Sequence, residues 1–213
     1  MRTESDFLGS VKLPDDCLYG INTARAVSNF NISGKAVHKE LIYELIMLKR
    51  SAAVANRDAG LLDDNIAQYI VSACDKLSFK IDMSLFPTDT LQGGAGTSIN
   101  MNVNEVVCNT ALLIAGRRCG DYDFIDPLDH VNLNQSTNDI FPTAVRIASI
   151  KLIRKLSDAC AQLQTALQAK EQEFAHIKKI GRTELMNATE ITLGEQFGSY
   201  AQCIARDRWR IYK

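Results

Sequence analysis

A pentapeptide of small polar residues, Gln135–Asp139, stands directly before the longest helical pattern in the chain. Ser, Thr, Asn and Asp at such a place cap free backbone amides, and Pro142 is tolerated near the start of the helix that follows. The free amides and the positive end of the helix dipole make a helix start a ready site for an anion. Ser136, Thr137 and Asn138 are therefore candidate ligand-binding residues.

Two further polar clusters stand at or near predicted helix starts. Thr97 and Ser98 follow a run that contains three glycines, which let a backbone come close to a ligand. Taken alone, this stretch is an ordinary capped helix after a tight turn, and it is not a phosphate loop because no Gly-Lys-Ser/Thr follows. The third cluster, Arg182–Glu184, precedes a helix that we expect to begin near Thr189. Hydroxyl and amide groups at three predicted helix starts favour a site for a small carboxylate.

His130 lies between Asp129 and Asn132, and the residues alone leave three interpretations open. It can be a solvated loop residue, a hydrogen-bonded structural histidine or part of an anion site, and the structural interpretation is favoured. The chain has only three histidines and no CxxC pair among its six cysteines, so we expect no metal site and no cofactor. The cysteines are expected to be buried free thiols in a reducing cytoplasm.

Composition excludes several classes of protein. The net charge is −1, so no bulk electrostatic attraction to nucleic acid or a membrane surface is expected. No stretch is apolar and long enough to span a bilayer, and residues 1–6 lack the apolar core of a signal peptide. With 46% apolar residues, the 213-residue chain has ample material for the core of a globular protein.

The apolar periodicity predicts a mainly α fold. Residues 1–34 are expected to be irregular, with a short extended pair or loop over Leu8–Pro14. Helices are expected over 35–58, from 63, from 97, over 139–170 and from 189 to the chain end. We expect an N-terminal, mostly helical domain over 1–138 and, over 139–213, the start of a long-helix bundle domain. The apolar stripe of the long helix is wider than a lone helix could hide, which favours self-association.

At these polar clusters the sequence resembles the aspartase/fumarase superfamily. The similar blocks are Tyr19–Gly34, Gln92–Val107, Asp129–Ala144, Gly181–Ala188 and Leu193–Phe197. They cover almost the whole chain, in the family's order. Within the superfamily, Gly-Ala-Gly-Thr-Ser and Gln-Ser-Thr-Asn-Asp look like the motifs of the aspartate ammonia-lyases, whereas the fumarase pattern typically reads Ser-Ser-Asn at the second of these.

The resemblance implies a homotetramer built on a central helix bundle, and a small dicarboxylate or amino-acid substrate. The implied reaction is the reversible elimination of ammonia from L-aspartate to give fumarate. By carry-over, Thr97, Ser98, Ser136 and Thr137 would bind substrate carboxylates, and Asn138 would act at the amine or a carboxylate. Thr183 and Glu184 would complete the catalytic site. His130 matches a secondary anion-site position.

The sequence departs from the family pattern in three places. Glu184 stands where His or Gln is usual, and Asn187 stands where Asp is usual, which puts strict aspartate specificity in question. The mobile Gly-Ser-Ser loop that supplies the catalytic serine base does not occur in these residues. We therefore expect an N-terminal portion that is inactive alone. The alternatives are another superfamily lyase that releases fumarate, or a non-catalytic assembly or regulatory homologue.

Overall fold

The computed structural model describes all 213 residues, which form two compact units, residues 1–148 and 149–213. Most of the chain is helical, which confirms the predicted mainly α fold. The domain boundary that the sequence places at 138/139 stays a prediction about the whole protein. None of the helices has the length and hydrophobicity that a membrane-spanning segment needs.

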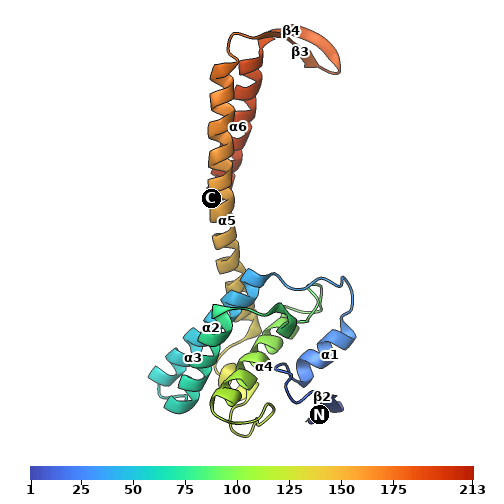
Figure 1. The fold of residues 1–213 in the computed structure, drawn as a ribbon, viewed down its shortest axis with the longest axis vertical. Coiled ribbons are helices and arrows are strands. Elements are labelled where there is room, and N and C mark those ends of the chain that lie inside the picture. The colour runs from blue at the N-terminus through green and yellow to red at the C-terminus, as the bar shows by residue number, and fades with distance from the viewer. The chain divides into compact units, whose positions relative to one another are not determined.

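Three helices build the centre of the first unit: α2 (Lys39–Asp58), α3 (Asp64–Phe79) and α4 (Thr97–Ile114), which lie side by side (Figure 1). The Asp63 carboxylate caps α3 by accepting hydrogen bonds from Asn65 N and Ile66 N. The predicted start of α2 at residue 35 is wrong. Residue 36 pairs with residue 89 in an isolated bridge, and the His38 ring caps the helix by accepting from Glu40 N.

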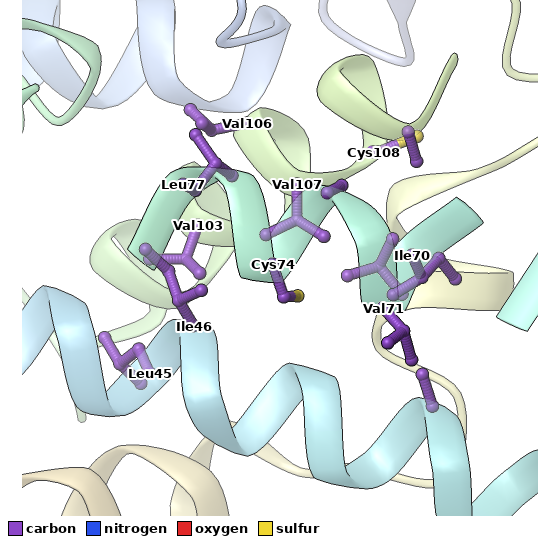
Figure 2. Packing of buried hydrophobic residues seen from close by; sticks show 14 of the residues in the cluster. Leu45, Ile46, Ile70, Val71, Cys74, Leu77, Val103, Val106, Val107 and Cys108 are labelled. Atoms are coloured by element: carbon purple, nitrogen blue, oxygen red, sulfur yellow. The ribbon is translucent and has the colours of Figure 1, made fainter. Parts of the chain in front are cut away.

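The core of this unit is aliphatic and surrounds α4. Figure 2 shows side chains of α2, α3 and α4 interlocked in it, including Leu45, Ile46, Ile70, Val103 and Val107. Full burial of each such side chain contributes roughly 1.5–3 kcal/mol to folding. Two short helices complete the layer, the 3₁₀ helix η1 (Met83–Leu85) and the π-helical turn η2 (Pro127–Val131). This packing fixes the position of the α4 N-terminus.

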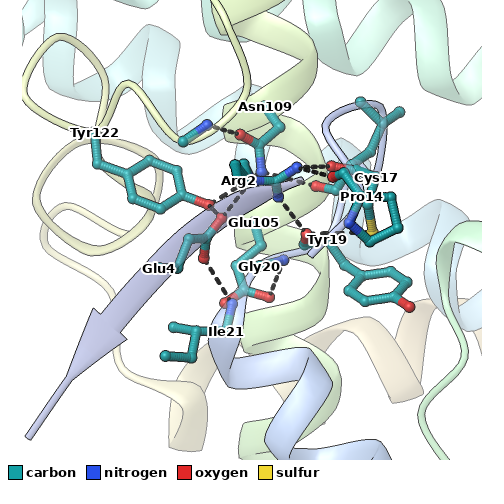
Figure 3. Close-up of polar contacts among 12 residues, drawn as sticks. Arg2, Glu4, Pro14, Cys17, Tyr19, Gly20, Ile21, Glu105, Asn109 and Tyr122 are labelled. Atoms are coloured by element: carbon teal, nitrogen blue, oxygen red, sulfur yellow. Dashed lines mark hydrogen bonds and ion pairs between the residues drawn. The ribbon is translucent and has the colours of Figure 1, made fainter. Parts of the chain in front are cut away.

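The N-terminal region is ordered, so the expectation of an irregular segment over residues 1–34 is wrong, except for the extended pair or loop expected over Leu8–Pro14. Strands β1 (Arg2–Asp6) and β2 (Gly9–Leu13) form an antiparallel hairpin, and helix α1 (Ile21–Asn29) follows. Gly20 is the N-cap residue of α1 and offers no side-chain cap. The cap comes instead from distant carboxylates, since Glu105 accepts from Gly20 N at 2.8 Å and Glu4 accepts from Ile21 N at 2.8 Å (Figure 3).

These capping carboxylates are themselves held by neighbours. Arg2 Nε and the Tyr122 hydroxyl both donate to Glu4 Oε1, at 2.8 Å and 3.1 Å. Thr23 Oγ1 donates to Glu105 Oε2 at 2.5 Å. Burial raises the pKa of Glu105, and the hydrogen bonds it accepts oppose that shift. The start of α1 is therefore fixed to α4.

The second unit contains part of α5 (Thr137–Glu173), an antiparallel hairpin of β3 (Lys178–Thr183) and β4 (Met186–Thr192), and helix α6 (Leu193–Tyr212). The predicted helix start at Thr189 is wrong, because residues 186–192 form a strand. Thr192 is the N-cap of α6 and forms a capping box with Glu195. α6 lies beside α5 (Figure 1), with Phe197 against Phe174 at a ring separation of 5.5 Å.

All six cysteines are free thiols. Cys74, Cys108 and Cys119 are buried, whereas Cys17 and Cys160 are half-buried and Cys203 is exposed. Burial raises the pKa of Cys74 to about 12, so this thiol stays protonated at neutral pH. The expectation of buried thiols therefore holds for half of the cysteines.

Candidate functional site

Two helix N-termini meet in the first unit, the start of α4 at Thr97 and the start of α5 at Thr137. Asn100, one turn into α4 and 1% exposed, joins them. Its Nδ2 donates to Thr137 Oγ1 at 3.1 Å and to Asn132 Oδ1 at 3.2 Å. The structure thus brings together two of the three polar clusters that the sequence singled out.

A glycine turn leads into α4 and packs directly against α5. Gly94 and Gly96 have φ of 75° and 87°, in the left-handed region that favours glycine. A Cβ at Gly96 would lie 2.5 Å from ring carbons of Phe141, so only glycine allows this approach. A hollow of about 300 Å³ opens here. It is lined by Thr90, Gln92, Gly94, Ala95, Gly96, Ile99, Asn138, Phe141 and Pro142.

The start of α4 has no side-chain cap, because its N-cap residue is Gly96. Helix starts without such a cap present amide donors that suit an anion. Thr97 is exposed and Ser98 is half-buried, and Ile99 N donates to Gln92 Oε1 at 3.3 Å. The first turn of α4 therefore offers two hydroxyl groups beside backbone donors, an arrangement that can bind a carboxylate.

The start of α5 presents a second set of donors. Ser136 Oγ accepts from Asn138 N at 3.2 Å, and Ser136 O accepts from Asp139 N at 3.0 Å. The hydroxyl keeps its own proton to donate. Ser136 and Asn138 are exposed and Thr137 is half-buried, and Asn138 also lines the hollow beside the glycine turn. These three residues can reach a ligand that lies over both helix starts.

A buried lysine supports the turn before Ser136, and sequence reasoning missed it. Lys49 Nζ donates to Asn132 Oδ1 at 2.8 Å and to Gln135 Oε1 at 2.9 Å. Gln135 Nε2 donates in turn to Val131 O at 2.9 Å. Burial lowers the pKa of Lys49 to about 7. The available signal was a lysine among the apolar residues of a predicted helix, a pattern that usually marks the solvent edge of a helix.

His130 lies in η2 as a hydrogen-bonded residue of the loop. Its Nδ1 accepts from Asp126 N at 2.9 Å, while the Asp126 carboxylate accepts from Leu128 N and Asp129 N. This geometry supports the structural interpretation of the residue. Its role in a secondary anion site stays a prediction from the resemblance.

Thr183 and Glu184 lie in the second unit, and the expectation that their cluster precedes a helix is wrong. Thr183 ends β3, and Glu184 and Leu185 form the two-residue turn to β4. Both turn residues have positive φ, 50° and 63°, and all three residues are exposed. Such turns favour Asn and Gly, so this pair carries backbone strain. Their place in a site with the first unit stays a prediction.

Metal-ligating side chains do not gather anywhere in the chain, since no group of three or more His, Cys, Asp or Glu is placed to hold an ion. The donors at the two helix starts are hydroxyls, amides and backbone N–H groups. Such neutral donors suit an organic anion and are poor ligands for transition metals.

Residues 9–213 match a family described as lyase. An aspartate ammonia-lyase from Bacillus sp is 48% identical over 211 residues, which are 99% of this chain and 45% of that protein. A class II fumarate hydratase from Nitrosomonas europaea is 44% identical over 200 residues, 93% of this chain and 43% of that one. The chain thus spans less than half the length of these relatives.

A solved structure has the same fold. The native crystal structure of a fumarate lyase:delta crystallin from Brucella melitensis superposes with a TM-score of 0.93 at 44% identity. The match covers 99% of this chain and 48% of that chain.

Proposed function

The chain belongs to the lyase family, the aspartase/fumarase superfamily that its motifs indicate, and we propose that the whole protein is an aspartate ammonia-lyase. One observation carries the proposal. The hydroxyl-bearing starts of α4 and α5 lie together, linked by the hydrogen bond from Asn100 Nδ2 to Thr137 Oγ1. A dicarboxylate needs donors for two separate anionic groups, and two helix starts side by side supply them.

The reaction proposed is the elimination of ammonia from L-aspartate to give fumarate. A base removes a proton from the carbon next to the β-carboxylate, and the electron pair moves onto the carboxylate oxygens as a dianionic enediolate. The enediolate then collapses, the carbon–nitrogen bond breaks and ammonia leaves. By the resemblance, the base is a serine that this stretch of sequence does not include.

This chain's own residues would bind and stabilise. Thr97, Ser98, Ser136 and Thr137 would donate hydrogen bonds to the carboxylates, and preorganised donors of this kind stabilise charge as it develops. Asn138 would contact the amine or a carboxylate. Thr183 and Glu184 would act from the β3–β4 turn. The core packing behind α4 and the glycine turn would hold the first set of donors rigid.

A second candidate is a hydratase that forms fumarate from a hydroxy acid, and the 44% identity to a class II fumarate hydratase favours it. The third candidate is a homologue without catalysis, which Glu184 in place of the usual residue supports. These candidates differ in substrate, so a substrate screen separates them.

The experiment follows fumarate formation by the full-length protein, with L-aspartate and L-malate offered separately. We expect turnover of aspartate and none of malate. Thr137→Val should lower kcat/KM by at least about tenfold, the effect of losing a hydrogen bond to a charged group. The matched control is Thr165→Val, an exposed threonine on the same helix whose hydroxyl bonds Ala161 O. Turnover of malate alone would favour the hydratase, and no turnover the non-catalytic homologue.

The whole protein is further proposed to be a cytoplasmic homotetramer. Support for self-association comes from the second unit's section of α5, which exposes a row of aliphatic side chains: Ile150, Leu152, Ile153, Leu156 and Leu163. Exposed apolar patches on long helices commonly mark interfaces. Light scattering that shows a monomer of the full-length protein at high concentration would contradict this proposal.

A further inference from the structure

Lys49 is a fully buried lysine that pairs with no carboxylate. Its side chain is 0% exposed in the middle of α2, and both oxygens that accept from its ammonium are amide oxygens, of Asn132 and Gln135. A lysine is almost never completely buried unless it is paired, because a desolvated charge is costly. A neutral aliphatic residue would fill the same space without that cost. The lysine is therefore more than packing.

A short chain of hydrogen bonds leads from this ammonium to the candidate site. Asn132 Oδ1 accepts from Lys49 Nζ and also from Asn100 Nδ2 and Asn104 Nδ2, both at 3.2 Å. Asn100 Nδ2 in turn donates to Thr137 Oγ1. One carbonyl oxygen and one amide group thus separate the ammonium from the Thr137 hydroxyl.

The same cluster contains buried acceptors that lack partners, namely Asn100 Oδ1 and Asn104 Oδ1. Buried polar atoms without a partner are uncommon and costly. The two asparagines direct their donors toward Asn132 Oδ1 and leave their own oxygens unpaired. The side chains of this cluster therefore point their amide donors toward the turn, and two of their amide oxygens remain without a hydrogen-bond donor.

We propose that Lys49 is a positioning residue of the dicarboxylate site, which holds the turn before Ser136 and places a positive charge behind Thr137. The inference rests on the proposed function. The side-chain donors that this chain presents at the two helix starts are neutral, and a cation one layer below them offsets part of the charge of a bound dianion through a medium of low dielectric. Removal of the lysine should therefore weaken ligand binding more than it weakens the fold.

If Lys49 has this role, its protonation state should change when a dicarboxylate binds. With a pKa near 7, Lys49 is largely neutral at pH 8 in the free protein. A bound dianion favours the charged form of a nearby lysine. Binding at pH 8 should therefore be accompanied by uptake of protons from solution.

Titratable groups lie on each of the elements that pack against α2, namely α3, α4 and η2. From α3, Cys74 has its pKa raised to about 12. From α4, Glu105 is engaged with the start of α1. From η2, Asp129 is exposed and the His130 ring accepts from Asp126 N. Asn100, Asn104, Asn132 and Gln135 are amides and take up no protons, so the Lys49→Met variant shows whether the uptake comes from the lysine.

The test is calorimetric titration of the full-length protein with succinate, a dicarboxylate that lacks the amine. Measurements at pH 8 in two buffers of different ionisation enthalpy give the number of protons taken up. The variants are Lys49→Met and, as the matched control, Arg50→Met. Arg50 is the next residue of α2 and pairs with Asp75 at the surface. Aspartate turnover is measured in parallel.

We expect the wild type to take up protons on binding, and Lys49→Met to bind succinate at least about tenfold more weakly without proton uptake, as expected for loss of a charge-assisted interaction. Arg50→Met should behave as the wild type. Wild-type binding without proton uptake would overturn the inference even if Lys49→Met failed to fold. So would a folded Lys49→Met that keeps affinity and uptake. A wild type that turns over aspartate in either case leaves the proposed function standing.

Discussion

The Asn100 amide of α4 lies 3.1 Å from the Thr137 hydroxyl of α5, and this hydrogen bond ties together two helix starts that are 40 residues apart in the chain. Asn100 itself is buried and bonds Asn132 as well. It therefore fixes the start of α4 relative to the start of α5, the two parts of the candidate carboxylate site.

Replacement of Asn100 should uncouple these halves. We expect Asn100→Ala to lower kcat/KM for aspartate by at least about tenfold, since a charged ligand would meet donors that are no longer preorganised. Steady-state kinetics of the full-length protein provide the measurement. Asn65→Ala is the control, because Asn65 is exposed at the start of α3. Equal losses in both variants would show that the effect is not local to the site.

Gly96 should tolerate no side chain. An added Cβ would meet the Phe141 ring at 2.5 Å and would force a left-handed backbone on an L-residue. Gly116 has a similar φ of 74° but open space around it, so Gly116→Ala reports the backbone cost alone, roughly 1–2 kcal/mol. We expect the melting temperature of Gly96→Ala to fall well below that of Gly116→Ala. Equal melting temperatures would mean that the contact with Phe141 is loose.

Asp89 should make the free energy of unfolding depend on pH in the acid range. It accepts from Ser33 Oγ at 2.6 Å and from backbone amides of Ser33, Gly34 and Leu91, and so anchors the segment before the glycine turn. The Ser33 hydroxyl and these amides hold the pKa of Asp89 well below its usual value. The folded state therefore binds fewer protons than the unfolded state in acid. This stabilisation is complete above about pH 4 and is lost as the pH falls below it.

The prediction is measured by thermal unfolding of the wild type and Asp89→Asn from pH 7 to pH 2. The variant should melt lower at pH 7, and the difference should narrow below pH 4. Asp123→Asn is the control, because Asp123 is an exposed aspartate of the same unit. A difference between wild type and Asp89→Asn that stays constant with pH would contradict the assignment.

Local sequence signals, such as the residues that begin and end helices, predict much of this fold. Asp63 before α3 and Gly116 after α4 are ordinary helix boundaries, and both were placed correctly. α1 was missed because its cap, Glu105, lies 85 residues from Gly20. The β3–β4 hairpin was missed because Glu184 and Leu185 replace the Asn or Gly that such a turn favours.

The candidate site likewise contains some residues that the sequence indicates and others that it does not. Thr97, Ser98 and Ser136–Asn138 can be placed at helix starts from the sequence, because hydroxyl side chains there have a recognisable spacing. Asn100 and Lys49 were missed because a helical pattern does not say which polar side chain is buried. Only the packing of α2 against the 131–135 turn shows that Lys49 is fully enclosed.

Glu184 should affect the substrate step. It is exposed at a strained turn, a kind of position that persists at functional sites. We expect Glu184→Gln to keep the fold and to change kcat/KM for aspartate. The change should correspond to about 1.5–3 kcal/mol of transition-state stabilisation, the effect of losing a charged contact to a reacting ligand. Glu190→Gln is the control, because Glu190 is an exposed residue of β4 that pairs with Lys178. Identical pH profiles of kcat/KM for the wild type and Glu184→Gln would identify an ordinary solvated turn residue.

The central claim is that a dicarboxylate binds where α4 and α5 begin. A crystal structure of the full-length protein with succinate tests it most directly. The account predicts one carboxylate within hydrogen-bond distance of the Thr97 hydroxyl and the first amides of α4. It predicts the other carboxylate at Ser136 and Thr137. Succinate bound elsewhere, with neither helix start in contact with it, would contradict the account.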